Sequence, residues 1–163
     1  MNLRALLLPL LTVLPLLGCG GGAGSGAACA TLTPTNRPHL DLTWEVKHGS
    51  MDDDPPRAQV KLLLKGAMAD AVDLGEILGL CKMLEVGTVP EQAPAGLKVT
   101  ELACAANGKT EFAALVVDSP GKLVLRRYRR AGEGPIEKLT EVKSFEVPSC
   151  TQYGVELSQG GAL

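Results

Sequence analysis

The stretch HLDLTWEVKH, residues 39–48, indicates most clearly which fold this chain adopts. Apolar and polar side chains alternate along it without interruption. The apolar positions are Leu40, Leu42, Trp44 and Val46. Because successive side chains of a β-strand point to opposite faces, this period of two predicts a strand with one buried face and one solvent-facing side. The folded part of the chain is therefore expected to begin near His39.

A second alternating run, RAQVKLLLKG (residues 57–66), follows after a turn. Its apolar face would consist of Ala58, Val60, Leu62 and Leu64. The intervening GSMDDDPP, residues 49–56, is rich in the residues that interrupt strands. The two runs are therefore expected to form an antiparallel hairpin with an acidic tip.

Strand signals also dominate the second half of the chain. LKVTELACAA (97–106) and TEFAALVVD (110–118) flank Asn107-Gly108, a dipeptide typical of the tight type I′ hairpin turn. KLVLRRYRR (122–130) and EKLTEVKSFEV (137–147) follow, and the latter is the last strand we expect.

The segment AMADAVDLGEILGLCKMLE, residues 67–85, is ambiguous. Several of its apolar residues recur at helical spacing, but Gly75 and Gly79 would each cost a helix interior about 1 kcal/mol relative to alanine. A strand is favoured here, and a short helix is the alternative. Taken together, the pattern predicts a mainly β fold after an N-terminal signal helix, a small antiparallel sandwich or barrel of about six to seven strands stapled by disulfides.

The first twenty residues carry a different pattern. A single positive charge at Arg4 precedes an apolar stretch from Ala5 to Leu17, which is the layout of a secretory signal peptide. The stretch is shorter than the roughly 20 residues that span a bilayer. It ends in Leu16-Leu17-Gly18-Cys19.

This ending resembles the lipobox of bacterial lipoproteins. The resemblance implies that residues 1–18 are removed as a signal peptide and that Cys19 is diacylglyceryl-modified, usually acylated on its amino group, and so anchored in a membrane. Gly20, where the family has aspartate in proteins kept in the inner membrane, favours the outer membrane, facing the periplasm or the cell surface. The alternative is an ordinary signal peptide cut near Ala27-Ala28, with loss of Cys19.

Three regions follow from these patterns: the signal peptide 1–18, a segment 19–38, and a single β-rich domain 39–163. Within 19–38, GGGAGSGAA (20–28) is expected to be a flexible tether. TLTPTNRP (31–38) is expected to continue as extended, proline-restricted chain.

Four cysteines remain when Cys19 is set aside. An even number in an exported chain indicates disulfides, and their wide spacing does not suit the close pairs of a zinc site. We expect the nested pairing Cys81–Cys104 inside Cys29–Cys150, because the first two lie in neighbouring strand-like segments and the second two bracket the domain.

The composition limits the kinds of partner that this chain is expected to bind. The formal net charge of −2 and the scarcity of aromatic residues argue against a nucleic-acid-binding surface. The densest charge lies around Tyr128 and consists of Arg126, Arg127, Arg129 and Arg130. Arginine suits carboxylates and phosphates, so this patch is a candidate site for an acidic protein or lipid partner. The alternative is a solvated strand end whose arginines face Glu137, Glu141 or Glu146 on the next strand.

No catalytic motif or cofactor site stands out in the sequence, and no metal site is predicted. Asp52-Asp53-Asp54 lacks the spacing of a calcium loop, and His39 and His48 would point to opposite faces of one strand. Asp73 and Glu76 are a carboxylate pair of a kind common on surfaces.

These observations favour a non-catalytic, lipid-anchored protein of the cell envelope with a structural or protein-interaction role. The alternative is a binding module that holds a small apolar or lipid ligand inside the sandwich or barrel. A cavity of several hundred Å³ would favour this second function, and a filled interior the first.

Overall fold

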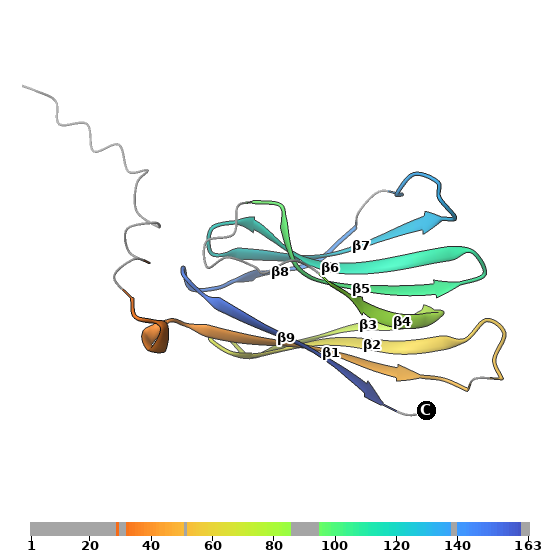
Figure 1. Ribbon diagram of the computed structural model, residues 1–163, viewed down its shortest axis with the longest axis horizontal. Coiled ribbons are helices and arrows are strands. Elements are labelled where there is room, and N and C mark those ends of the chain that lie inside the picture. The colour runs from red at the N-terminus through yellow and green to blue at the C-terminus, as the bar shows by residue number, and fades with distance from the viewer. Residues whose placement is uncertain (1–28, 30–31, 51, 86–94, 138–139, 161–163) are drawn as a thin grey trace, which may run out of the picture.

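The chain forms two stacked β-sheets in the computed structural model (Figure 1), which describes residues 29, 32–50, 52–85, 95–137 and 140–160. A short 3₁₀ turn, η1 (Pro34–Asn36), precedes the strands. The first sheet contains β1 (His39–His48), β2 (Arg57–Gly66), β3 (Asp70–Leu78) and β9 (Gln152–Gly160). The second contains β4 (Leu80–Leu84), β5 (Leu97–Ala106), β6 (Lys109–Ser119), β7 (Lys122–Ala131) and β8 (Thr140–Glu146). The predicted mainly β sandwich is confirmed, and the sheets do not close into a barrel.

Sheet order follows the sequence closely. The strands are arranged β3-β2-β1-β9 in one sheet and β4-β5-β6-β7-β8 in the other. Neighbours are antiparallel except for β1 and β9, which run parallel from His39↔Gln152 to Lys47↔Gly160. The hairpin turn of β5 and β6 has the positive φ angles, 50° at Asn107 and 70° at Gly108, that a type I′ turn needs.

Gly79 moves the chain from the first sheet to the second. The ambiguous segment 67–85 consists of β3 and β4, so the strand interpretation is right and the helix alternative is wrong. Gly79 has φ of 113°, and a Cβ there would lie 2.3 Å from the carbonyl oxygen of Ala105. Only glycine permits this backbone angle and this close approach, and the chain therefore crosses between sheets at a single residue.

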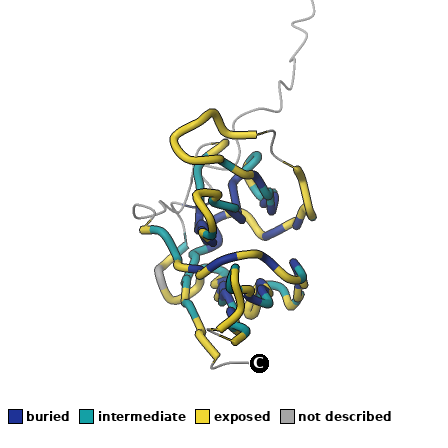
Figure 2. Tube along the Cα trace, turned by 90° about the vertical axis from the view of Figure 1, so that its right-hand side faces the viewer, coloured by how far each residue is buried: buried dark blue, intermediate teal, exposed yellow. Residues whose placement is uncertain are grey.

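The core lies between the two sheets (Figure 2). The predicted apolar faces of β1 and β2 are buried, and the largest side chain there is Trp44, with no exposed surface. Its indole Nε1 donates a hydrogen bond of 2.9 Å to Oγ1 of buried Thr100 on the opposite sheet. A large aromatic donor inside a core needs such a partner, because a buried and unpaired N–H group is costly.

The described residues form two strands more than the upper limit of seven that we expect. One arises because Gly79 divides segment 67–85 into β3 and β4, and the other is β9. The sequence predicts the last strand at residues 137–147, yet Gln152–Gly160 forms a further strand, and β8 itself spans Thr140–Glu146. The inward-facing residues of β9 are Tyr153, Val155 and Leu157, which are only partly buried against the core.

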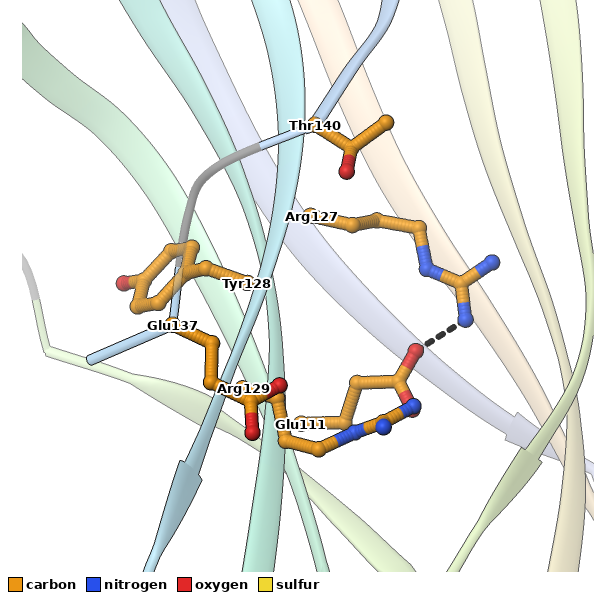
Figure 3. Close-up of a pocket in the computed structure, with 6 residues that line it drawn as sticks. All are labelled: Glu111, Arg127, Tyr128, Arg129, Glu137 and Thr140. Carbon is orange, nitrogen blue, oxygen red and sulfur yellow. Dashed lines mark hydrogen bonds and ion pairs between the residues drawn. The ribbon is translucent and has the colours of Figure 1, made fainter. Parts of the chain in front are cut away.

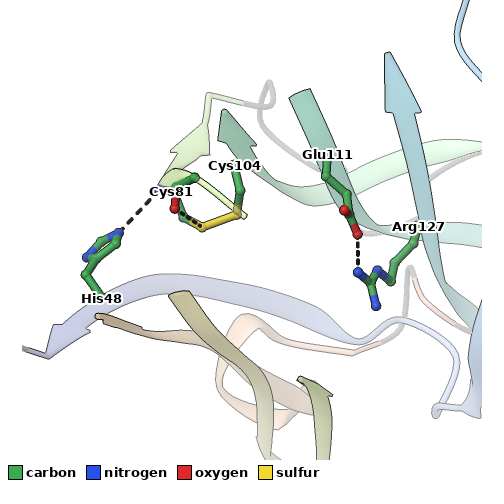
Figure 4. Close-up of a disulfide and its surroundings, with 6 residues drawn as sticks. His48, Cys81, Cys104, Glu111 and Arg127 are labelled. Carbon is green, nitrogen blue, oxygen red and sulfur yellow. Dashed lines mark hydrogen bonds and ion pairs between the residues drawn. A yellow bond between two sulfur atoms is a disulfide. The ribbon is translucent and has the colours of Figure 1, made fainter. Parts of the chain in front are cut away.

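Two disulfides join the chain in the nested pattern expected from the spacing. Cys81 and Cys104 lie directly opposite each other on β4 and β5, with Cα atoms 3.9 Å apart, a little closer than the expected range (Figure 4). Cys29 and Cys150 have Cα atoms 5.4 Å apart and are separated by 121 residues. The longer bridge attaches the segment before β1 to the segment before β9.

Candidate functional site

The predicted lipid anchor lies outside the described residues. Cys19, the signal peptide 1–18 and the tether 20–28 all fall in the first 28 residues, of which the structure describes none. Among the residues that it does describe, no helix has the length and apolar character needed to cross a membrane.

The four candidate arginines lie on one strand, β7, but on opposite faces of it. Arg126 and Arg130 share the outer face of the five-stranded sheet with Tyr128. Arg127 and Arg129 point to the other side, away from Tyr128 (Figure 3). This follows from the period of two along a strand. The predicted single patch therefore consists of two pairs with different surroundings.

The inward pair is held by one carboxylate. Glu111 on β6 forms an ion pair with Arg127, and its second oxygen lies 3.6 Å from Nη2 of Arg129. Arg127 also donates a hydrogen bond of 3.2 Å to the carbonyl oxygen of Leu74 on β3. This arginine therefore links the two sheets. Its contact with Glu111 is drawn in Figures 3 and 4.

A surface pocket of about 330 Å³ lies at this inward pair. It is lined by Glu111, Arg127, Tyr128, Arg129, Glu137 and Thr140. Since two carboxylates accompany the two arginines, the pocket has no strong preference for an anion.

The outward pair has different partners. Nη2 of Arg126 lies 3.0 Å from a carboxylate oxygen of Asp118, and the guanidinium of Arg130 lies 5.7 Å from the ring centroid of Phe112. Phe112 stacks on Tyr128 with centroids 4.7 Å apart. The Nε of Arg130 is buried and has no hydrogen-bond partner among the described residues.

Lys98 on β5 completes this arrangement. Its Nζ donates hydrogen bonds of 2.9 Å to the Tyr128 hydroxyl and 2.7 Å to Glu101. A shallow apolar groove of about 150 Å³ lies beside it, lined by Lys98, Ala114, Val116, Arg126, Tyr128 and Ile136. We refer to Lys98, Arg126, Tyr128, Arg130 and Ile136 as the cationic face.

The carboxylates that form ion pairs with these arginines lie on the preceding strand. The sequence offers Glu137, Glu141 and Glu146, on or before β8, but the ion pairs form with Glu111 and Asp118 of β6. Of the three glutamates, Glu141 does lie directly opposite Arg126 in the pairing of β7 with β8. β6 pairs with β7 along the whole of 126–130, whereas β8 begins only at Thr140, so more of these arginines have a facing residue on β6.

The two histidines lie apart. His39 lies 2.8 Å from Asp41 on the outer face of β1, and Nε2 of His48 accepts a 3.3 Å hydrogen bond from the backbone N–H of Cys81 (Figure 4). In the part of the chain that the structure covers, no group of three or more metal-ligating side chains occurs.

The carboxylates Asp73 and Glu76 each have a cationic neighbour on β2. Asp73 accepts a 2.8 Å hydrogen bond from the backbone N–H of Gly75 and lies 3.4 Å from Lys61, and these contacts lower its pKa. Glu76 lies 2.6 Å from Arg57. A carboxylate with a lowered pKa is a poor general acid at neutral pH.

Phe112, Lys98 and Glu111 also belong to the site, although no motif in the sequence marks them. A signal was present, because counting back across the Ser119-Pro120-Gly121 turn places Phe112 near Tyr128 and Glu111 near Arg129. Lys98 lies on a third strand, and no local pattern predicts its contact. Compared with protein family models, with curated proteins and with solved structures, the chain has no match.

Proposed function

We propose that this chain is a lipid-anchored, non-catalytic protein of the cell envelope that binds an acidic protein partner through the cationic face. The lipobox-like residues before Cys19 support the anchor. Two disulfides suit an oxidising compartment outside the inner membrane. Gly20 after the cysteine favours the outer membrane.

The observation that carries the interaction role is the filled interior of the sandwich. Side chains without exposed surface occupy the space between the sheets, among them Trp44, Leu62, Leu115 and Leu125. A small apolar or lipid ligand inside the fold would need a cavity of several hundred Å³. The packed core therefore favours a function on the outer surface over the internal-ligand alternative.

The cationic face has the composition of an interaction surface. Lys98 and Arg126 lie beside Glu101 and Asp118, and Glu141 of β8 lies opposite Arg126 in the strand pairing. Arg130 forms no ion pair among the described residues, so its charge is available to an acidic partner. Ile136 is 56% exposed beside these residues. Arginine and an exposed apolar residue together are typical of protein interfaces.

The anchor is tested by mass spectrometry of the mature chain. We expect an N-terminus at Cys19 that carries acyl chains, and Cys19→Ser should yield a product without lipid. Several acyl chains give stable anchoring, whereas one gives only marginal binding. A mature N-terminus near Cys29 without acyl mass would contradict the anchor.

The interaction is tested by chemical cross-linking in intact cells, followed by quantification of the neighbours recovered with the protein. The double variant Arg126→Gln/Arg130→Gln should lose an acidic neighbour, because it removes the two outward guanidinium groups. Lys47→Gln/Lys65→Gln, on the outer face of the other sheet, removes the same charge and should keep that neighbour. Equal recovery from both variants would assign the arginines to ordinary solvation, and selective loss of binding to anionic vesicles would indicate a lipid partner instead.

A further inference from the structure

β9 is an edge strand whose outer edge is free among the described residues. Its nine residues pair with β1 on one side, and β1 lies between β9 and β2 in the sheet. Figure 1 shows β9 running along the side of β1 away from β2. The outward N–H and C=O groups of such a strand match only another extended strand.

The other three sheet edges carry features that prevent strand addition. β3 contains Asp70, Asp73 and Glu76 and a register shift where it pairs with β2. β4 has only five residues, and β8 alternates Glu141, Lys143 and Glu146 before Pro148. Charges, irregularities, short length and proline are the usual protections of edge strands.

β9 lacks most of these protections. It contains no lysine, arginine or proline, and Glu156 is its single charged residue. Its inward row, Tyr153, Val155 and Leu157, is only partly buried, whereas the adjacent residues Leu42 and Trp44 of β1 have no exposed surface. A half-covered apolar row therefore runs along the unprotected edge.

We propose that a second copy of this chain binds here, with the two β9 strands antiparallel and related by a two-fold axis at Val155. Val155 then lies opposite Val155 of the second copy, and Tyr153 lies opposite Leu157. Glu156 lies opposite Gly154. The four-stranded sheets join into one, and the two apolar rows cover each other.

Charge and side-chain direction select this register. Centring the pair on Glu156 would place two carboxylates directly opposite each other, which is destabilising. Centring it on Gly154 would leave Leu157 without an apolar partner. Centring it between two residues would turn the apolar row of one strand toward the opposite face of the sheet.

Gly154 leaves Glu156 of the second copy without a side chain directly opposite it. The space over Gly154 is bounded by β1, because a Cβ there would lie 2.9 Å from Asp41 and 3.3 Å from the imidazole of His39. In the proposed register the glutamate of the second copy therefore lies beside the His39–Asp41 pair.

Cysteine cross-linking of the full chain, purified in mild detergent, tests the register. In Val155→Cys the two new thiols lie directly opposite, with Cα atoms about 4.5–5.5 Å apart, inside the range that a disulfide spans. In the matched variant Leu157→Cys the two thiols are offset by four residues, about 14 Å along the strands, and cannot join. Mild oxidation should give a peptide linked through residue 155 and none through residue 157. Equal linking of both variants, or linking of neither while both native disulfides remain, would overturn the proposal.

Sedimentation tests the association itself. The wild-type chain should approach twice its monomer mass as concentration rises. Val155→Lys should remain monomeric, because two positive charges would face each other, and Val155→Ile should still dimerise. If the wild-type chain remains monomeric at every concentration, the proposal is wrong. This holds even if another protein binds to the free edge of β9 in the cell.

Discussion

At the scale of single residues, the contact between Trp44 and Thr100 specifies how the two sheets face each other. It is a hydrogen bond between side chains with no exposed surface, and its partners lie on opposite sheets. Apolar packing alone tolerates small shifts of one sheet over the other, whereas a buried donor and its acceptor fix one arrangement. The alternation in residues 39–48 predicts that Trp44 is buried. The identity of its partner, 56 residues away, is not encoded in any local pattern.

Thr100→Val should lower the free energy of unfolding by about 1–3 kcal/mol, because it leaves the buried indole N–H without an acceptor at nearly constant volume. Urea unfolding of the oxidised protein measures this change. Thr43→Val, on the outer face of β1 next to Trp44, is the control and should change stability by less than about 0.5 kcal/mol. Equal effects of the two variants would show that the hydrogen bond contributes nothing specific.

At the scale of elements, the period of two predicts β1, β2, β5, β6 and β7 close to their observed bounds. It fails at β9, because small and polar residues between Gln152 and Gly160 weaken the alternation. That strand depends on parallel pairing with β1, more than 100 residues earlier, and on the Cys29–Cys150 bridge. The sequence of segment 67–85 is ambiguous because glycine destabilises the interior of helices and strands alike. The crossing between the sheets explains the glycine at position 79. The period of two also predicts that the four arginines lie on opposite faces of β7. Which residues they contact depends on the strands that pair with β7.

An ion pair between elements of different sheets gives the fold an acid-sensitive contact. Lys143 on β8 donates to Asp70 on β3, and with the backbone N–H of Ala71 it holds the pKa of Asp70 below its ordinary range. A lowered pKa in the folded state contributes stability above the unfolded value, near pH 4, and that contribution is lost as the pH falls below it.

Asp70→Asn should therefore flatten the decline in stability between about pH 4 and pH 2, compared with the wild-type chain. Denaturant unfolding at a series of pH values measures the slope. Lys143→Gln leaves the carboxyl group in place but removes its main donor, so it should flatten the slope partly. Identical acid slopes in all three proteins would show that this pair does not contribute.

At the scale of the whole molecule, the two disulfides constrain very different lengths of chain. The bridge Cys81–Cys104 closes a loop of 23 residues, and Cys29–Cys150 closes one of 121. In the chain-entropy account, a longer loop removes more freedom from the unfolded chain.

Replacing Cys29 and Cys150 by serine should cost about 5 kcal/mol, and replacing Cys81 and Cys104 by alanine about 3 kcal/mol. Both pairs of substitutions leave the other bridge intact, so each is the control for the other. Denaturant unfolding gives the two losses. A larger loss from the shorter loop would contradict the dependence on loop length.

The bridge between Cys29 and Cys150 also has a mechanical consequence. β1 and β9 both start beside it and run in the same direction. Tension on the N-terminal segment, as the proposed anchor at Cys19 would deliver, enters at Cys29 and is divided between the first and last strands. The two strands are then loaded from the same end and do not slide past each other. Reduction of the bridge would place the whole load on β1 and turn the same pull into shear against its neighbours.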